Sequence, residues 1–70
     1  MAKHTFQLSQ EYIQLNQLLK VMGWAMTGGE ANVIIDAGLV KVNGEIEWRR
    51  RNKIYSGFEV SYEDELVVVE

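Results

Sequence analysis

Four cations lie within five consecutive residues near the middle of the chain, and their side chains are suited to binding phosphate. They are Arg49, Arg50, Arg51 and Lys53. A guanidinium group can bind phosphate through two parallel N–H donors and can stack on an unpaired base, so this cluster is typical of a nucleic-acid contact. One alternative stays open, because cations on an exposed strand edge or loop also prevent aggregation through edge pairing.

The charge of the chain is unevenly distributed. Seven Lys and Arg residues against ten Asp and Glu residues give a formal net charge of -3. Five of these cations fall within residues 41–53, whereas residues 59–70 contain five carboxylates and no cation. A chain with this separation can present one basic surface to a polyanion although the whole molecule is acidic.

The composition gives little support to catalysis or metal binding. The chain has no cysteine and one histidine, His4, so it lacks the ligands of a common zinc site and the partners for histidine-dependent acid–base chemistry. No nucleophile–base pair or pair of carboxylates stands out, and 70 residues leave little room for an enclosed pocket. We expect no enzyme activity, no cofactor, no metal and no small-molecule substrate.

One domain over residues 1–70 is expected, because a chain of this length forms at most one core. The longest apolar runs, such as residues 66–69, are too short to cross a bilayer. Residues 1–20 lack the continuous apolar stretch of a signal peptide. We therefore expect a cytoplasmic protein that makes no membrane contact.

The elements that position the basic cluster begin with a short strand and a helix. Apolar and polar residues alternate over residues 5–8, which weakly indicates a strand. Four apolar residues then recur at helical spacing on one stripe, and Gly23 is suited to end this first helix. The stripe consists of Leu15, Leu18, Leu19 and Met22.

A second helix is predicted to begin after Thr27, because Thr27-Gly28-Gly29-Glu30 has the form of a capping box. In that arrangement the Thr27 hydroxyl accepts from the Glu30 N–H, and the Glu30 carboxylate accepts from the Thr27 N–H. Gly38 is expected to be a left-handed residue after the end of the helix, with Leu39 folding back as in a Schellman ending. The buried side is predicted to contain Ala31, Ile34 and Ile35.

Strands are predicted after the second helix. Residues 40–42 alternate, and Asn43-Gly44 has the sequence of a two-residue hairpin turn in which both residues adopt positive φ. Alternation continues over residues 45–49 and 58–62, and the apolar run 66–69 suits a last strand. This order predicts an α+β fold, with two short helices packed on one face of a small, mostly antiparallel sheet of four to five strands.

The two tryptophans have two possible uses, as core residues or as platforms for bases. Large aromatic side chains in a chain this small usually belong to the core, so we expect at least one of them to be buried. Trp48 is the better candidate for exposure, because it adjoins Arg49.

Residues 14–62 together resemble the S4 RNA-binding domain, an αL motif. The resemblance is carried by the spacing of Glu30-Ala31, Ile34-Ile35, Gly38, Val42-Asn43-Gly44 and the later Gly57-Phe58-Glu59-Val60. The Thr-Gly-Gly sequence and the segment from Arg49-Arg50 to Lys53-Ile54 are similar to the short stand-alone S4-like proteins of bacteria. Many family members have Arg or Lys at the start of the second helix, where this chain has Gly28, Gly29 and Asn32.

The resemblance implies a module that binds structured RNA through its helices and the adjoining hairpin, by phosphate contacts and shape more than by base sequence. Ribosomal RNA or a ribosome-associated RNA is the implied substrate, with the ribosome or ribosomal proteins as further partners. For Gly28-Gly29, a flexible helix entry and a backbone contact to phosphate both stay open. The candidate RNA-binding residues are Lys20, Thr27, Gly28, Gly29, Lys41, Asn43, Arg49, Arg50, Arg51 and Lys53.

A second class of function also stays open. The acidic C-terminal part of the chain could dock on a basic partner such as a ribosomal protein, which would make the protein an interaction adaptor. Its carboxylates are Glu59, Glu63, Asp64 and Glu65.

Overall fold

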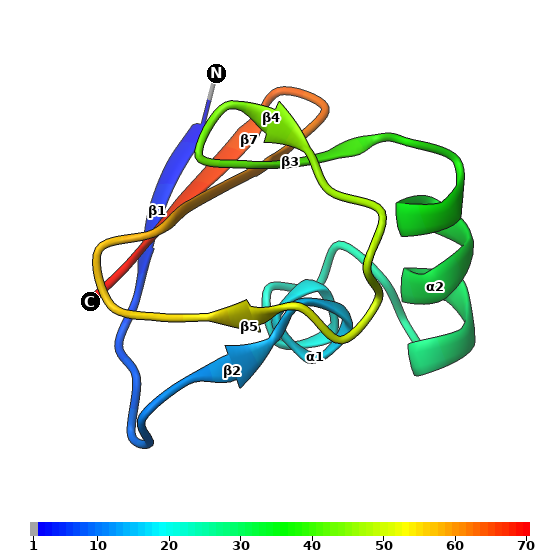
Figure 1. Ribbon diagram of the computed structural model, residues 1–70. Coiled ribbons are helices and arrows are strands. Elements are labelled where there is room, and N and C mark those ends of the chain that lie inside the picture. The colour runs from blue at the N-terminus through cyan, green and yellow to red at the C-terminus, as the bar shows by residue number, and fades with distance from the viewer. Residues whose placement is uncertain (1) are drawn as a thin grey trace.

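Two helices and two sheets make up the computed structural model, which describes residues 2–70 (Figure 1). The helices are α1 (Leu15–Val21) and α2 (Gly28–Asp36). The strands are β1 (Ala2–Phe6), β2 (Ile13–Gln14), β3 (Val40–Val42), β4 (Glu45–Ile46), β5 (Lys53–Ile54), β6 (Glu59–Tyr62) and β7 (Glu65–Val69). Five strands form one sheet in the order β1-β7-β6-β3-β4, and β2 pairs with β5 in a separate small sheet. No helix within residues 2–70 is long and apolar enough to span a membrane.

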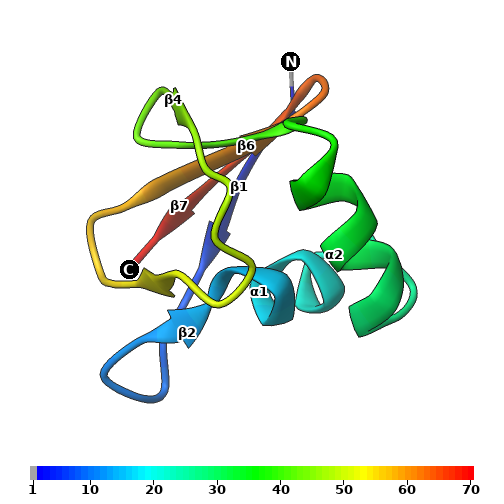
Figure 2. The same ribbon diagram turned by 45° about the vertical axis from the view of Figure 1, so that its right-hand side comes forward.

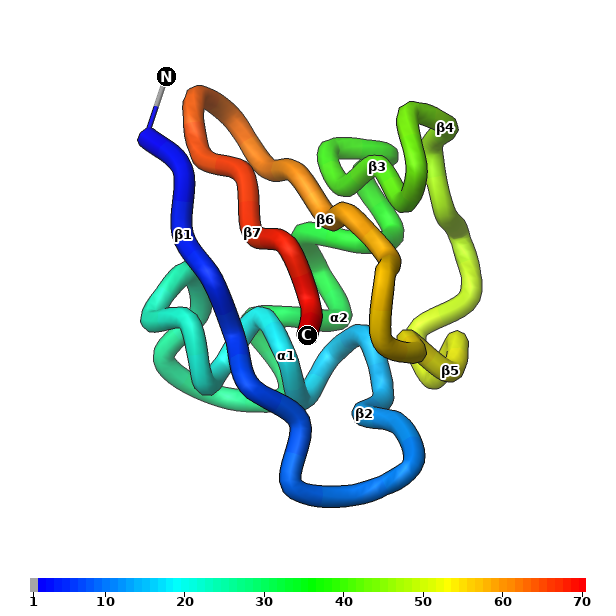
Figure 3. Tube along the Cα trace, turned by 90° about the vertical axis from the view of Figure 1, so that its left-hand side faces the viewer, coloured from blue at the N-terminus to red at the C-terminus, as the bar shows by residue number. Residues whose placement is uncertain are grey.

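The larger sheet is mostly antiparallel, as predicted, except that β1 pairs with β7 in parallel. This pairing also corrects the bounds of the first strand, which was predicted over residues 5–8. The register with β7 places the strand at Ala2–Phe6, and backbone hydrogen bonding continues to Leu8, whose N–H donates to Glu70 O at 2.8 Å. Figure 3 shows β1, β7, β6 and β3 side by side with both helices behind them, so the helices cover one face of the sheet.

The predicted helix signals are confirmed, with one change in the capping box. The Thr27 Oγ1 atom accepts from the Glu30 N–H at 3.1 Å, and α2 begins at Gly28. The Glu30 carboxylate, however, accepts from the Met26 N–H at 3.2 Å, one residue earlier than predicted. The first turn of α2 is therefore closed by two side chains from its own start.

The end of α2 and the turn that follows have the predicted backbone. Gly38 has a φ of 74°, and the Gly38 and Leu39 N–H groups donate to Ile35 O and Ile34 O, as in a Schellman ending. Asn43 and Gly44 both have positive φ in the hairpin turn between β3 and β4. The strand predicted over residues 45–49 is shorter, because the chain leaves the sheet after Ile46. The last bond on this side joins the Glu47 N–H to Val40 O.

The core lies between the helices and the larger sheet. Its largest fully buried side chains are Leu15, Leu18, Leu19, Ile35, Val40, Ile54, Val60, Val67 and Val69. The Trp48 side chain is exposed, as predicted, whereas Trp24 is only partly buried and packs against the core with its ring centre 6.0 Å from that of Tyr62. The core thus leaves Trp48 on the surface beside the cationic cluster.

The small sheet was not predicted, because two-residue strands show no periodicity. Ile13 pairs with Ile54 and Gln14 with Lys53. Figure 2 shows this sheet directly before α1, with the chain between β4 and β5 passing the start of α1. The pairing therefore ties the end of the cationic cluster to the start of α1.

Candidate functional site

The segment between β4 and β5, residues 47–52, is called here the arginine loop, and its backbone closes the start of α1. The Leu15 N–H donates to Asn52 O at 2.9 Å, and the Asn16 N–H donates to Arg50 O at 3.0 Å. These amides belong to the first turn of α1, which has no side-chain cap of its own. The arginine loop is therefore held in a defined position against the helix.

Two of the three loop arginines form ion pairs within the molecule. Arg50 binds Asp36 of α2 through two hydrogen bonds, one of them from Nε to Oδ1 at 3.0 Å. Arg49 binds Glu47 through Nε and Nη2 at 3.0 and 3.2 Å. Within residues 2–70, Arg51 and Lys53 form no salt bridge, although Lys53 Nζ lies 4.9 Å from the ring centre of Tyr12. The positive charge of residues 47–53 that no carboxylate compensates is therefore concentrated on Arg51 and Lys53.

The two ion pairs change the pKa of their carboxylates. Hydrogen bonding from the Arg50 guanidinium lowers the pKa of Asp36, and the Arg49 guanidinium likewise lowers the pKa of Glu47. The Arg50 and Asp36 side chains remain about half exposed, so water screens their interaction. Such a pair contributes little to stability, and its arginine can exchange the carboxylate for a phosphate.

A dependence of stability on acid pH follows from these shifts. Because Asp36 and Glu47 have a lower pKa in the folded state, the unfolded state binds more protons in acid, and the free energy of unfolding rises with pH there. The stabilisation is fully present at neutral pH and is lost as the pH falls through the folded-state pKa values. We expect Arg50→Gln to weaken this dependence when urea unfolding is measured between about pH 2 and pH 6.

Arg51→Gln is the matched control for that experiment, because Arg51 pairs with no carboxylate within residues 2–70. It should keep the pH dependence of the wild type. Equal pH profiles for Arg50→Gln and the wild type would contradict a role for the Arg50–Asp36 pair.

The two helices meet the arginine loop along one face. Asn16 of α1 donates through Nδ2 to Asn32 Oδ1 of α2 at 3.2 Å, and Asp36 lies one turn beyond Asn32. Lys20 lies one turn beyond Asn16, on the same side of α1. We call this surface the helical face; its residues are Asn16, Lys20, Gly28, Gly29, Asn32, Asp36, Arg50 and Arg51.

The start of α2 leaves two backbone donors open on the helical face. The N–H groups of Gly28 and Gly29 precede the first intrahelical hydrogen bond, which the Ala31 N–H makes to Thr27 O. A Cβ atom added at Gly28 would meet nothing within 4 Å, and one at Gly29 only Thr27 Oγ1 at 3.8 Å. Neither glycine has positive φ, so the fold does not require glycine at these positions.

The two hairpin candidates lie away from this face. Val40 and Val42 are buried toward the helices, so Lys41 between them points to the opposite, uncovered face of the sheet. Asn43 holds the hairpin to β6, since its Oδ1 accepts from the Glu59 N–H at 2.9 Å and its N–H donates to Glu59 O at 2.7 Å. The expected face of helices and hairpin is therefore divided, with Lys41 separate from Lys20 and the arginine loop.

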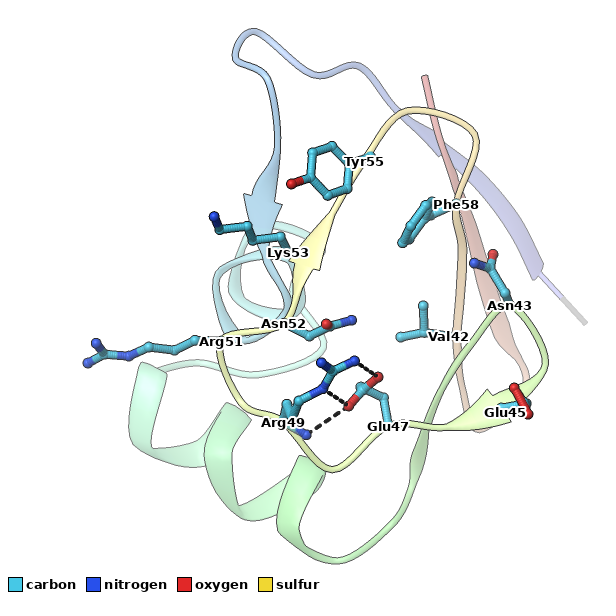
Figure 4. Close-up of a pocket in the computed structure, with 10 residues that line it drawn as sticks. All are labelled: Val42, Asn43, Glu45, Glu47, Arg49, Arg51, Asn52, Lys53, Tyr55 and Phe58. Carbon is cyan, nitrogen blue, oxygen red and sulfur yellow. Dashed lines mark hydrogen bonds and ion pairs between the residues drawn. The ribbon is translucent and has the colours of Figure 1, made fainter.

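A groove of about 770 Å³ separates the hairpin from β5 (Figure 4). It receives Asn43, Arg49 and Lys53 from the predicted set, while the Arg51 side chain at its edge points outward (Figure 4). Sequence reasoning missed Asn52, Tyr55 and Phe58, and a signal was present in the aromatic residues that closely follow the cations. The full lining is Val42, Asn43, Glu45, Glu47, Arg49, Arg51, Asn52, Lys53, Tyr55 and Phe58.

The acidic part of the chain is separate from the arginine loop. Glu63 and Asp64 form an exposed turn between β6 and β7, in which Glu63 has a φ of 55°. Glu65 Oε1 lies 3.1 Å from His4 Nε2, so His4 has a partner rather than only solvent. Within residues 2–70 no three His, Cys, Asp or Glu side chains are grouped so that they could hold a metal.

Comparisons with known proteins identify similar sequences and a similar structure. The family model of the S4 domain matches residues 6–70. The YbcJ proteins of Escherichia coli strain K12 and Shigella flexneri are each 42% identical over 59 residues, which cover 83% of this chain and 84% of theirs. The solution structure of Escherichia coli YbcJ has a TM-score of 0.65 and 37% identity, covering 97% of this chain and 87% of that one. That structure is described as revealing an αL motif involved in RNA binding.

Proposed function

This chain belongs to the S4 domain family, and on that basis we propose that it is a module that binds structured RNA. The observation that carries the proposal is the arginine loop, whose backbone is fixed to the start of α1 and whose side chains border the helical face. Ribosomal RNA or a ribosome-associated RNA in the cytoplasm is the proposed target. The description of the similar YbcJ structure as containing an αL motif involved in RNA binding supports the proposal that this chain binds RNA.

The cations proposed to contact phosphate differ in whether they form an ion pair within the protein. Arg51 and Lys53 are free to bind phosphate, because neither forms a salt bridge within residues 2–70. Arg49 and Arg50 have exposed guanidinium groups and exchange their carboxylate partners for phosphate; before RNA arrives, those partners keep the guanidinium groups oriented. Lys20 extends the positive surface along α1. Lys41 is the exception, because its position on the other face of the sheet leaves it only a long-range attraction.

The start of α2 is the proposed site of a backbone contact. The open N–H groups of Gly28 and Gly29, together with the positive end of the helix dipole, suit a phosphate, and the absence of side chains lets it approach. Thr27 holds this turn in place through its bond to the Glu30 N–H. This contact takes the place of the cations that many family members have here.

Substitution of the two glycines by alanine should separate stability from binding. Gly28→Ala/Gly29→Ala meets no steric obstacle and replaces helix-disfavouring residues, so the free energy of unfolding should rise by up to about 1 kcal/mol. RNA affinity should fall, because two methyl groups then cover the N–H groups. Val21→Ala, at an exposed position of α1 that is not part of the helical face, is the control and should leave affinity unchanged. Unchanged RNA affinity in the stabilised double variant would contradict the backbone contact.

Salt titration tests the proposed function itself. The affinity of the protein for cellular ribosomal RNA should fall steeply as salt is raised, because phosphate contacts release counterions. Binding that is absent at low salt would refute the proposal. It would then favour an adaptor that docks its exposed Glu63–Asp64 turn on a basic protein, a proposal supported by the separation of that turn from the arginine loop.

A further inference from the structure

We propose that the groove between the β3–β4 hairpin and β5 holds one unpaired nucleotide of the bound RNA, with its base inside. The inference rests on the proposed RNA-binding function and specifies the class of RNA: a helix interrupted by a bulge or a loop. The groove adjoins the arginine loop, since Arg49, Arg51 and Asn52 belong to both. A nucleotide in the groove is therefore continuous with phosphates on the loop.

Aromatic side chains form one end of the groove. The ring centres of Tyr55 and Phe58 lie 5.8 Å apart, and Tyr55 also lies 5.8 Å from Tyr12 on its other side. Phe58 packs against the core and so fixes the position of this row of three rings, while the Tyr55 side chain stays 37% exposed. Figure 4 shows both rings beside the open space of the groove. Rings held in this way can stack on a base without losing further side-chain freedom.

The polar lining favours a base over a phosphate inside the groove. Glu45, which forms no salt bridge within residues 2–70, would repel a phosphate, but its carboxylate can accept a hydrogen bond from the amino group of a base. The Asn52 side chain points into the space and makes no hydrogen bond within residues 2–70 (Figure 4). Its amide can both donate to and accept from the edge of a base.

The cations lie where the sugar–phosphate chain would leave the groove. Lys53 and Arg51 are at its edge, with Arg51 pointing outward (Figure 4). The volume of about 770 Å³ is in the range of small-molecule sites. A paired base is stacked within its helix and cannot enter such a groove, whereas an unpaired base can be turned out.

Two RNA hairpins with the same stem test the inference, one fully paired and one with a single-nucleotide bulge. The wild type should bind the bulged hairpin about 5-fold to 150-fold more tightly, as expected for one base stacked on aromatic side chains. Tyr55→Ala should remove this preference while retaining affinity for the paired hairpin, and Tyr55→Phe should keep it. Asn52→Ala keeps the backbone cap of α1 and should reduce the preference, which provides a second variant if Tyr55→Ala does not fold.

Each other outcome overturns the inference in a recognisable way. Equal affinity of the wild type for both hairpins, or a preference unaffected by Tyr55→Ala and Asn52→Ala, refutes the groove as a base site and leaves the proposed function intact. Failure of the wild type to bind either hairpin or cellular ribosomal RNA at low salt refutes both.

Discussion

Arg51→Glu/Lys53→Glu is expected to lower the affinity for structured RNA by about tenfold or more. Each phosphate contact adds about 0.9 to the slope of log affinity against log salt, so two contacts contribute roughly 1.8 decades of affinity on extrapolation from 1 M to about 0.1 M salt. Reversing the charge adds repulsion to the two lost contacts. Neither side chain forms a salt bridge within residues 2–70, so the fold should persist, as circular dichroism would show.

The chain offers a matched control for this charge reversal. Lys3 and Lys41 both lie on the uncovered face of the sheet, and Lys3→Glu/Lys41→Glu changes the net charge by the same amount. The control should lose much less affinity and keep the salt dependence of the wild type. The Arg51→Glu/Lys53→Glu variant should instead show a slope lower by about 2 on a double-logarithmic salt plot. Equal losses in the two variants would mean that only net charge matters.

Gly38→Ala is expected to cause the largest loss of stability among single alanine substitutions of the glycines, about 1–3 kcal/mol. Gly38 has a φ of 74°, which strains a residue with a side chain. An added Cβ would also lie 2.8 Å from Trp48 Cη2, so the indole would have to move. Urea unfolding measures the loss, and a shift of tryptophan emission would report the displacement.

Two further variants separate the two causes of the stability loss in Gly38→Ala, the steric clash with Trp48 and the backbone strain. Gly57→Ala carries a comparable φ of 93° but meets nothing within 4 Å, so it should lose less than Gly38→Ala. With Trp48→Ala already present, Gly38→Ala should also lose less than it does alone. Equal losses for Gly38→Ala alone, for Gly57→Ala, and for Gly38→Ala in the Trp48→Ala background would mean that the contact between Gly38 and Trp48 has no energetic role. The contact also bears on RNA binding, because Trp48 belongs to the arginine loop.

Features set by neighbouring residues could be predicted from the sequence. The capping box at Thr27, the left-handed Gly38 and the Asn43-Gly44 turn each depend on a few consecutive side chains, and each was found. The parallel β1–β7 pair joins the two ends of the chain, and no local pattern encodes such a partner. The small β2–β5 sheet could not be predicted for the same reason, since its paired residues are 39 and 41 positions apart along the chain.

The candidate site was predictable in its residue types more than in its arrangement. The cationic cluster was evident, but the pairing of Arg50 with Asp36 joins residues 14 positions apart and depends on where the fold places the loop relative to the end of α2. The position of Lys41 on the opposite face follows from its buried neighbours Val40 and Val42, and alternation alone could have shown it. The groove could be identified only from the structure, because it forms between segments that are separate in the sequence and meet in the fold.

Mapping of amide chemical shifts during titration of the labelled protein with a bulged RNA hairpin tests the central claim most directly. The prediction is that the changes gather in residues 15–20, 28–32 and 49–55, which form most of α1, the start of α2, and the end of the arginine loop with β5. Changes confined to Lys3, Lys41, Ser61 and Leu66 on the uncovered sheet face, or no changes at all, would contradict the proposal that the arginine loop and the helical face bind RNA.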